Sequence, residues 1–172
     1  MFHRLAAALL LLSSPALAAD LTGSLRAGLG VGFASEFDEE LLFTAGLRGQ
    51  LGAVLGGEHA FFGVARLQPL ADTGLHDTAL GLSLGVGYER RFDVYQGWRP
   101  TLGITVGAGD AELCKSDVCG LSGPVAGLDL GVHRMLGRRS HLILSAELLT
   151  LVGTGTNTGT LLLPSVWAGV GF

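Results

Sequence analysis

The sequence predicts an all-β protein, an eight-stranded antiparallel up-and-down β-barrel that spans a membrane. First, large apolar residues alternate with small or polar ones over most of the chain, which is typical of strands with two different faces. Second, the chain is 48% hydrophobic and only 15% charged, below the roughly 25% charged residues of an average soluble domain. Its apolar runs are nevertheless too short for membrane helices. Since lipid tolerates only helices and closed barrels, a barrel with an apolar outer wall remains.

The first four expected strands carry large apolar residues on one face and glycine, serine, threonine or arginine on the other. The third is the least regular of the four, with Leu67 set against Arg66. Ten or so residues per strand match the length that a tilted membrane strand needs. The outward apolar positions are Leu21, Leu25, Ala27, Leu29, Val31 and Phe33 in residues 21–33; Leu41, Phe43, Ala45, Leu47 and Leu51 in 41–52; Ala65 and Leu67 in 60–68; and Leu80, Leu82, Leu84, Val86 and Tyr88 in 78–89.

The last four expected strands follow the same scheme, with one exception. The seventh, residues 141–151, alternates poorly because Leu142–Leu144 and Leu148–Leu149 are continuous apolar runs, so its facing is the least determined. The outward positions of the others are Leu102, Ile104 and Val106 in 100–108; Ala126, Leu128, Leu130 and Val132 in 124–134; and Val166, Ala168, Val170 and Phe172 in 161–172.

Residues 1–18 have the pattern of an export signal. Arg4 gives a positive start, an apolar run covers residues 5–12, and Ala16 and Ala18 frame a small-x-small cleavage site. A membrane anchor is the alternative, but this run falls far short of the roughly 20 residues that a membrane helix needs. We therefore expect a cleaved signal peptide at 1–18 and a barrel domain at 19–172.

The connections between the strands fall into two groups. An even number of strands returns both chain ends to the same side of the membrane. Acidic residues gather in the loops on the opposite side, and arginines with aromatic neighbours gather in the turns on the same side, as in an interfacial girdle. The loops are expected at 34–40, 69–77, 109–123 and 153–159, and the turns at 53–59, 90–99 and 136–140.

The face opposite the large apolar residues is mostly glycine, serine and threonine, which suits the crowded interior of a narrow barrel better than the surface of a soluble one. The last strand also ends on an aromatic residue, Phe172, with Val170 and Ala168 on the same face. On these features the chain resembles the small eight-stranded bacterial outer-membrane barrels of the OmpA/OmpX type. The resemblance implies an outer-membrane location and an assembly signal at Phe172, Val170 and Ala168, although that family usually has an aromatic residue where Val170 stands.

Six charged residues are expected on the inner face of the barrel. An unpaired charge in a narrow lumen is heavily penalised, whereas paired and hydrogen-bonded charges are tolerated. The main interpretation is therefore a salt-bridge network that plugs the lumen. The alternative is the charged constriction of a narrow pore, because charged rings set ion selectivity and the inward glycines leave room for water. The six residues are Arg26, Arg48, Arg66, Glu89, Asp129 and Glu147.

An enzymatic site is the competing class of function, since a few small barrels of this compartment modify lipid A or cleave peptides. His141, Ser145 and Glu147 share one face of the seventh strand. His141 and Ser145 are four strand residues apart, roughly 13 Å at 3.3 Å per residue, which is too far for a nucleophile and its base. The sequence therefore predicts no catalytic residue.

Cys114 and Cys119 lie in the loop expected at 109–123. In an exported chain with only two cysteines, a disulfide is the default expectation. Metal ligation is the weaker alternative, because two thiolates without a nearby histidine fall short of the four ligands of a structural zinc site.

The loop expected at 34–40 carries the densest acidic run of the chain. Carboxylate oxygens suit a calcium ion, and their charge suits a basic partner, while a simply solvated loop is the third interpretation. The four carboxylates belong to Glu36, Asp38, Glu39 and Glu40.

Together these features predict a monomeric outer-membrane β-barrel with a structural or surface-interaction role and a largely plugged lumen. No cofactor and no metal centre are expected. The expected partners are outer-membrane lipids and the barrel assembly machinery, and nucleic acid is not among them because the formal net charge is −4. A narrow pore and a lipid-modifying enzyme are the alternative functions.

Overall fold

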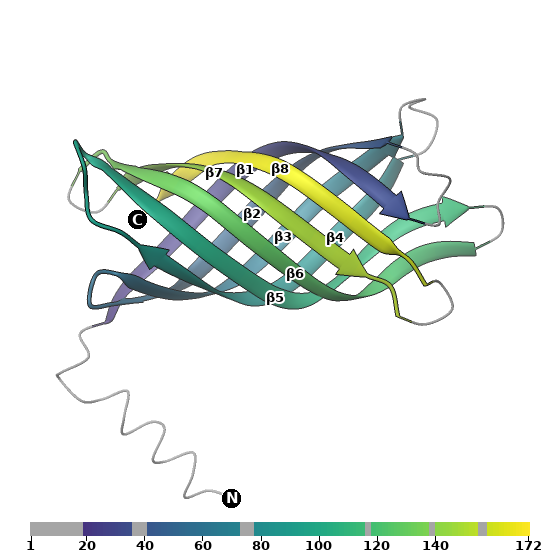
Figure 1. Ribbon diagram of the computed structural model, residues 1–172, viewed down its shortest axis with the longest axis horizontal. Coiled ribbons are helices and arrows are strands. Elements are labelled where there is room, and N and C mark those ends of the chain that lie inside the picture. The colour runs from purple at the N-terminus through teal and green to yellow at the C-terminus, as the bar shows by residue number, and fades with distance from the viewer. Residues whose placement is uncertain (1–18, 36–40, 73–77, 116–117, 138–139, 155–157) are drawn as a thin grey trace, which may run out of the picture.

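The computed structural model is a closed barrel of eight antiparallel strands in chain order, which confirms the predicted fold (Figure 1). It describes residues 19–35, 41–72, 78–115, 118–137, 140–154 and 158–172. Within these residues, no helix is long and apolar enough to cross a membrane. The strands are β1 (Ala19–Ser35), β2 (Leu41–Leu55), β3 (His59–Asp72), β4 (Thr78–Arg91), β5 (Trp98–Lys115), β6 (Val118–Met135), β7 (His141–Val152) and β8 (Thr160–Gly171).

Each strand pairs with the next one along the chain, and β8 pairs with β1 to close the barrel. The start of β1 and the end of β8 therefore lie at the same end of the barrel, together with the three short turns (Figure 1). We call this the terminus end and the opposite one the loop end. The turn between β2 and β3 is tight because Gly56 and Gly57 adopt positive φ angles of 61° and 75°, a conformation that glycine reaches without strain.

The two faces of the strands are sorted as the alternation predicts. Leu21 and Val86 on the outer wall keep 70% and 63% of their surface exposed, whereas Arg26 on the inner wall keeps 1%. An apolar outer wall is the condition for contact with lipid. The ambiguous seventh strand is also settled, because Ile143 is buried in the lumen and Leu144 is exposed on the outside.

The expected loop at 109–123 is wrong. β5 continues to Lys115 and β6 begins at Val118, so most of this segment is a paired hairpin that projects at the loop end (Figure 1). A shift in register between Ala111 and Cys114 marks the irregular part of the hairpin. The polar and small residues in this stretch indicate a loop by composition, but backbone pairing beyond the membrane needs no apolar face. β3 likewise runs through Pro69 to Asp72, where the sequence predicts a loop from 69 onwards.

Candidate functional site

The lumen at mid-height of the barrel contains a row of arginines on one wall. Arg48 on β2 lies directly opposite both Arg26 on β1 and Arg66 on β3 in the strand registers. Like charges in directly opposite positions repel each other, so this row needs compensation from elsewhere. On the facing wall, Asp129 of β6 and Glu147 of β7 are likewise directly opposite each other. Closure of the barrel thus places the three arginines opposite two carboxylates across the lumen.

Arg48 is the centre of this charge layer. One of its terminal nitrogens lies 2.5 Å from the Asp129 carboxylate and 3.3 Å from that of Glu147. Arg66 donates to both oxygens of Glu147, and its Nε–Oε2 distance is 3.2 Å. Arg26 approaches Asp129 to 3.6 Å. These side chains are almost completely buried, so each charge is neutralised by its partners rather than by bulk water.

Neutral side chains complete the hydrogen bonding of the arginines. Arg26 donates to the Ser145 hydroxyl at 3.0 Å and to the Gln50 side-chain oxygen at 2.7 Å. Arg66 donates to the Thr105 hydroxyl at 2.9 Å. These hydrogen bonds hold the guanidinium groups in position, in addition to the ion pairs that neutralise their charge.

The sixth predicted charge, Glu89, extends the layer toward the terminus end. Its carboxylate lies 3.7 Å from Arg26 and accepts a hydrogen bond of 2.9 Å from Arg91. His133 also approaches Glu89, at 3.7 Å, and its ring stacks on that of His141 with centroids 4.9 Å apart. All six predicted lumen charges are therefore brought together, and Arg91, His133 and His141 join them although the sequence does not predict their contribution.

The loop-end half of the lumen is lined mainly by apolar side chains, with the polar Thr44 and Gln68 buried beside them, and the alternation of the sequence does not predict this layer. Its side chains come from all eight strands except β4, and they are buried against one another. The available signal was the leucine-rich end of β7, where Leu149 and Leu151 are buried in the lumen. The buried cluster consists of Ala34, Leu42, Leu70, Ala111, Leu121, Val125, Leu149, Leu151, Leu161 and Leu163.

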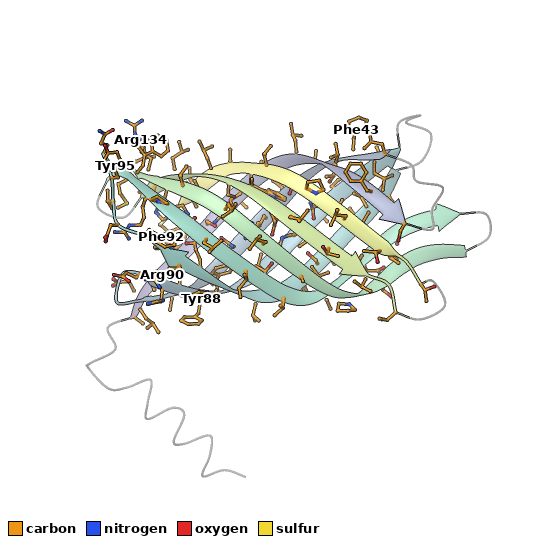
Figure 2. All side chains as sticks on the ribbon, viewed as in Figure 1. Phe43, Tyr88, Arg90, Phe92, Tyr95 and Arg134 are labelled. Atoms are coloured by element: carbon orange, nitrogen blue, oxygen red, sulfur yellow. The ribbon has the colours of Figure 1, made fainter. Side chains whose placement is uncertain are left out.

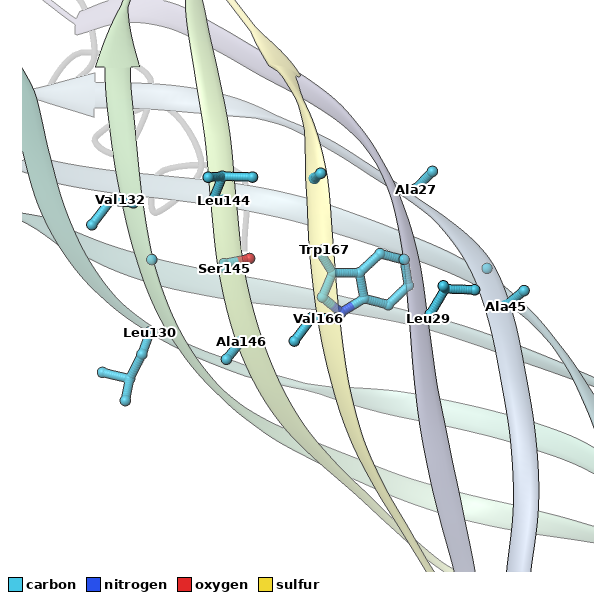
Figure 3. A pocket seen from close by; sticks show the side chains of 14 residues that line it. Ala27, Leu29, Ala45, Leu130, Val132, Leu144, Ser145, Ala146, Val166 and Trp167 are labelled. Atoms are coloured by element: carbon cyan, nitrogen blue, oxygen red, sulfur yellow. The ribbon is translucent and has the colours of Figure 1, made fainter.

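Trp167 of β8 fills the lumen beside the charge layer. Its side chain is 2% exposed, and its indole nitrogen donates to the Ser165 hydroxyl at 2.8 Å. The indole lies across the inner surface of β1 (Figure 3), where Gly28 leaves the space it occupies. A Cβ atom on Gly28 would collide with the ring and with the backbone oxygen of Val166, so both the tryptophan and the close approach of β8 favour glycine at this position.

Little empty space remains between these layers. One cavity of about 10 Å³ lies among Gln50, Glu89 and His133, and another of about 20 Å³ lies beside Gln68. Cavities of this size hold about one water molecule each. Such water would suit the buried nitrogens of Arg26, Gln50 and His133 that lack a protein partner.

Arginines and aromatic side chains lie together at the terminus end, among them Arg90, Arg134, Phe92 and Tyr95 (Figure 2). The guanidinium carbon of Arg90 lies 5.6 Å from the centre of the Phe92 ring, and that of Arg134 lies 5.2 Å from the centre of the Trp98 ring. Rings at this height match the aromatic girdle of membrane barrels, and the stacked arginines gain cation–π attraction.

Phe172 joins the two ends of the sheet. Its backbone nitrogen and oxygen pair with Gly23 at 2.9 and 3.0 Å, and the Thr22 hydroxyl donates to the same oxygen at 3.0 Å. Its ring is exposed on the outer wall, as are Val170 and Ala168. The assembly role predicted for these three residues stays a prediction.

Deleting Phe172 is expected to impair folding into membranes more than replacing a lipid-facing residue does. The deletion removes three hydrogen bonds at the β1–β8 seam, and an unsatisfied backbone group is costly in lipid. The fraction of protein that runs at the folded position on unheated gels measures the effect, with Val170→Ala as the control. Equal folded fractions for the two variants would contradict this prediction.

The residues considered for catalysis have other partners. His141 stacks on His133, Ser145 accepts from Arg26, and Glu147 binds Arg48 and Arg66. All three point into the lumen and are buried. No group of three or more potential metal ligands occurs among the described residues.

Two further predicted sites lie at or beyond the limits of the described side chains. Glu36, Asp38, Glu39 and Glu40 fall outside the described residues. For the cysteines, the structure places the backbone of Cys114 directly opposite that of Cys119 in the β5–β6 hairpin.

The cysteine pair is therefore expected to resist alkylation until it is reduced. Directly opposite residues of antiparallel strands have Cα atoms about 4.5–5.5 Å apart, within the range that a disulfide spans. Mass spectrometry after iodoacetamide treatment should show no label before reduction and two labels afterwards. Two labels on the oxidised protein, without reduction, would disprove the bond.

The sequence matches no known protein-family model, and a comparison with curated proteins finds no similar sequence. Solved structures do match. Neisserial surface protein A superposes with a TM-score of 0.64 at 17% identity, over 87% of this chain and 95% of that one. The N-terminal β-barrel domain of Pseudomonas aeruginosa OprF gives 0.51 at 14% identity, over 90% and 99%.

The outer membrane enzyme PagL also matches, with a TM-score of 0.57 at 10% identity over 84% of this chain and 97% of that one. At such identities the likeness concerns the fold and not the activity. The matching structures thus include a surface protein and an enzyme with the same fold. The protein has the fold of the small eight-stranded bacterial outer-membrane β-barrels.

Proposed function

We propose that the protein is a closed outer-membrane barrel with a structural or surface-interaction role and no transport through its lumen. The observation that carries this proposal is that two successive layers of side chains, one charged and one apolar, fill the lumen along the barrel axis. The paired charges of Arg26, Arg48 and Arg66 lie at mid-height, and a buried apolar layer lies between them and the loop end. An ion that passed the charges would next meet side chains that cannot hydrate it.

The proposed orientation places the terminus end in the periplasm and the loop end outside the cell. Support comes from the girdle of Arg90 and Arg134 with their aromatic partners at the terminus end. At the loop end, the projecting β5–β6 hairpin presents Asp110 and Glu112 on its exposed face. Export by a signal peptide at residues 1–18, which lie outside the described residues, belongs to the same proposal.

A narrow pore is the second candidate, and one observation favours it. Several buried nitrogens beside the charge layer have no protein partner, and water there would begin a hydrated path. The apolar layer opposes continuation of that path to the loop end, so the closed barrel is the better-supported function.

An enzyme is the third candidate, because PagL has a related fold. Its support in this chain is weak, since His141 and Ser145 bind other partners within the lumen. A lipid A acyl-chain assay with the purified protein tests it, and we expect no deacylation.

The closed-barrel proposal predicts that the protein does not raise the ion permeability of a membrane. Folded protein is reconstituted into vesicles that contain a pH-sensitive dye, and the collapse of an imposed proton and potassium gradient is followed. The expected rate equals that of protein-free vesicles. A rate that increases in proportion to the amount of folded protein would favour the pore instead.

A further inference from the structure

The outer wall of the barrel contains an apolar hollow of about 850 Å³ (Figure 3). It extends across five adjacent strands, from β6 through β7, β8 and β1 to β2. The hollow forms because four outward positions at its floor carry the small side chain of alanine, whereas the neighbouring Leu130 and Leu144 project further outward. The four floor residues are Ala27, Ala45, Ala146 and Ala168.

A positive charge lies just beyond the β6 edge of this hollow, toward the terminus end, where Arg134 leans over Trp98 of the neighbouring strand β5. Val132 lines the hollow, and Arg134 follows it two residues later on the same face of β6. The guanidinium of Arg134 rests over Trp98, with 5.2 Å between its carbon and the ring centre. Among the residues that the structure describes, no carboxylate pairs with Arg134, so its charge remains available to a ligand.

The corresponding arginine on the other side of the barrel is different. Arg90 also rests over an aromatic ring, that of Phe92, but the carboxylate of Glu58 lies 3.9 Å from it. The apolar hollow near that side, beside Phe61 and Tyr88, is smaller, about 480 Å³. The larger hollow and the uncompensated arginine therefore occur together on the same side of the barrel.

We infer that this hollow binds one anionic glycerophospholipid, whose acyl chains lie on the alanine floor and whose phosphate is held by Arg134. A chain lying there runs from the apolar middle of the wall to the girdle at the terminus end, which is the course of a phospholipid in one leaflet. Arginine binds phosphate through a planar fork of N–H donors, and its position on Trp98 fixes that fork at the height of the headgroups. This inference concerns the outer wall and does not depend on whether the lumen conducts.

The test uses the full folded barrel in a nonionic detergent and native mass spectrometry. Palmitoyl-oleoyl phosphatidylglycerol and the zwitterionic phosphatidylcholine with the same chains are added in separate titrations. We expect one retained lipid and a preference of about fivefold for phosphatidylglycerol, as one arginine near an anionic headgroup supplies. Arg134→Gln should remove the preference, while the matched control Arg90→Gln should keep it.

A second variant tests the shape of the hollow while leaving the charge of Arg134 in place. Ala146→Leu with Ala168→Leu raises the floor without changing any charge, and it should lower retention of both lipids. Folding of every variant is checked by its shift on unheated gels. Equal retention of the two lipids by the unmodified protein, an unchanged preference in Arg134→Gln, or no retained lipid would overturn the inference. A dimer mass that the raised floor abolishes would also overturn it, since a second copy would then occupy the hollow.

Discussion

Replacing Arg48 with alanine is expected to lower the free energy of unfolding by about 3–5 kcal/mol, the cost of removing one member of a buried network of ion pairs. Arg48 contacts both Asp129 and Glu147, so its loss removes the only side chain that links these two adjacent carboxylates within the described charge layer. Urea unfolding in lipid vesicles, followed by gel mobility, measures the change.

Two controls accompany this variant. Leu47→Met alters the neighbouring residue on the outer face of β2, and the expected change is within about 0.5 kcal/mol. Arg48→Lys keeps the charge but loses the planar fork, so its loss of stability should be intermediate. If Arg48→Ala instead left the unfolding transition unmoved and raised the conductance, the layer would be a gate and not a structural element.

Replacing Trp167 with alanine is expected to lower the free energy of unfolding by a similar amount, about 3–5 kcal/mol, because it leaves a large cavity in a packed interior. The ring is 2% exposed, so nearly all of its packing is lost. Unfolding in vesicles measures the change, and Val166→Ala, on the outer face of the same strand, is the control.

Gly28 supplies a sharper test of the same packing. In the unmodified protein, Gly28→Ala is expected to cost about 1–3 kcal/mol, since its new methyl group meets the indole. The same substitution should cost less in the Trp167→Ala background, so the two effects are not additive. Additive effects would show that the indole does not rest on Gly28.

The period of two made much of this fold predictable. The large apolar side chains of Leu25 and Leu84 face outward, as the alternation predicts. Because neighbouring residues of a strand face opposite sides, Arg26 then faces the lumen. The same pattern places all six lumen charges on the inner wall. It does not reveal which charges meet, because Arg48 and Asp129 are 81 residues apart in sequence and approach only when the barrel closes.

The apolar layer was not predictable for a different reason. Its residues in β7, Leu149 and Leu151, stand in a leucine-rich stretch that also contains Leu148 and fits either facing, so only the pairing of β7 with β6 and β8 decides that they point inward. His133 and His141 were likewise hidden, since their stacking depends on that register. The composition of residues 109–123 indicates a loop because charged and small residues, such as Asp110, Glu112 and Ser122, separate its few apolar ones.

Single-channel recording in planar bilayers shows whether the paired charges and the apolar layer close the lumen. We expect the unmodified folded protein to show no discrete conductance steps over a range of voltages. The heat-unfolded protein serves as the control for detergent effects. Reproducible, ion-selective openings from the unmodified protein would show that the lumen is open and make the narrow pore the better description of this barrel.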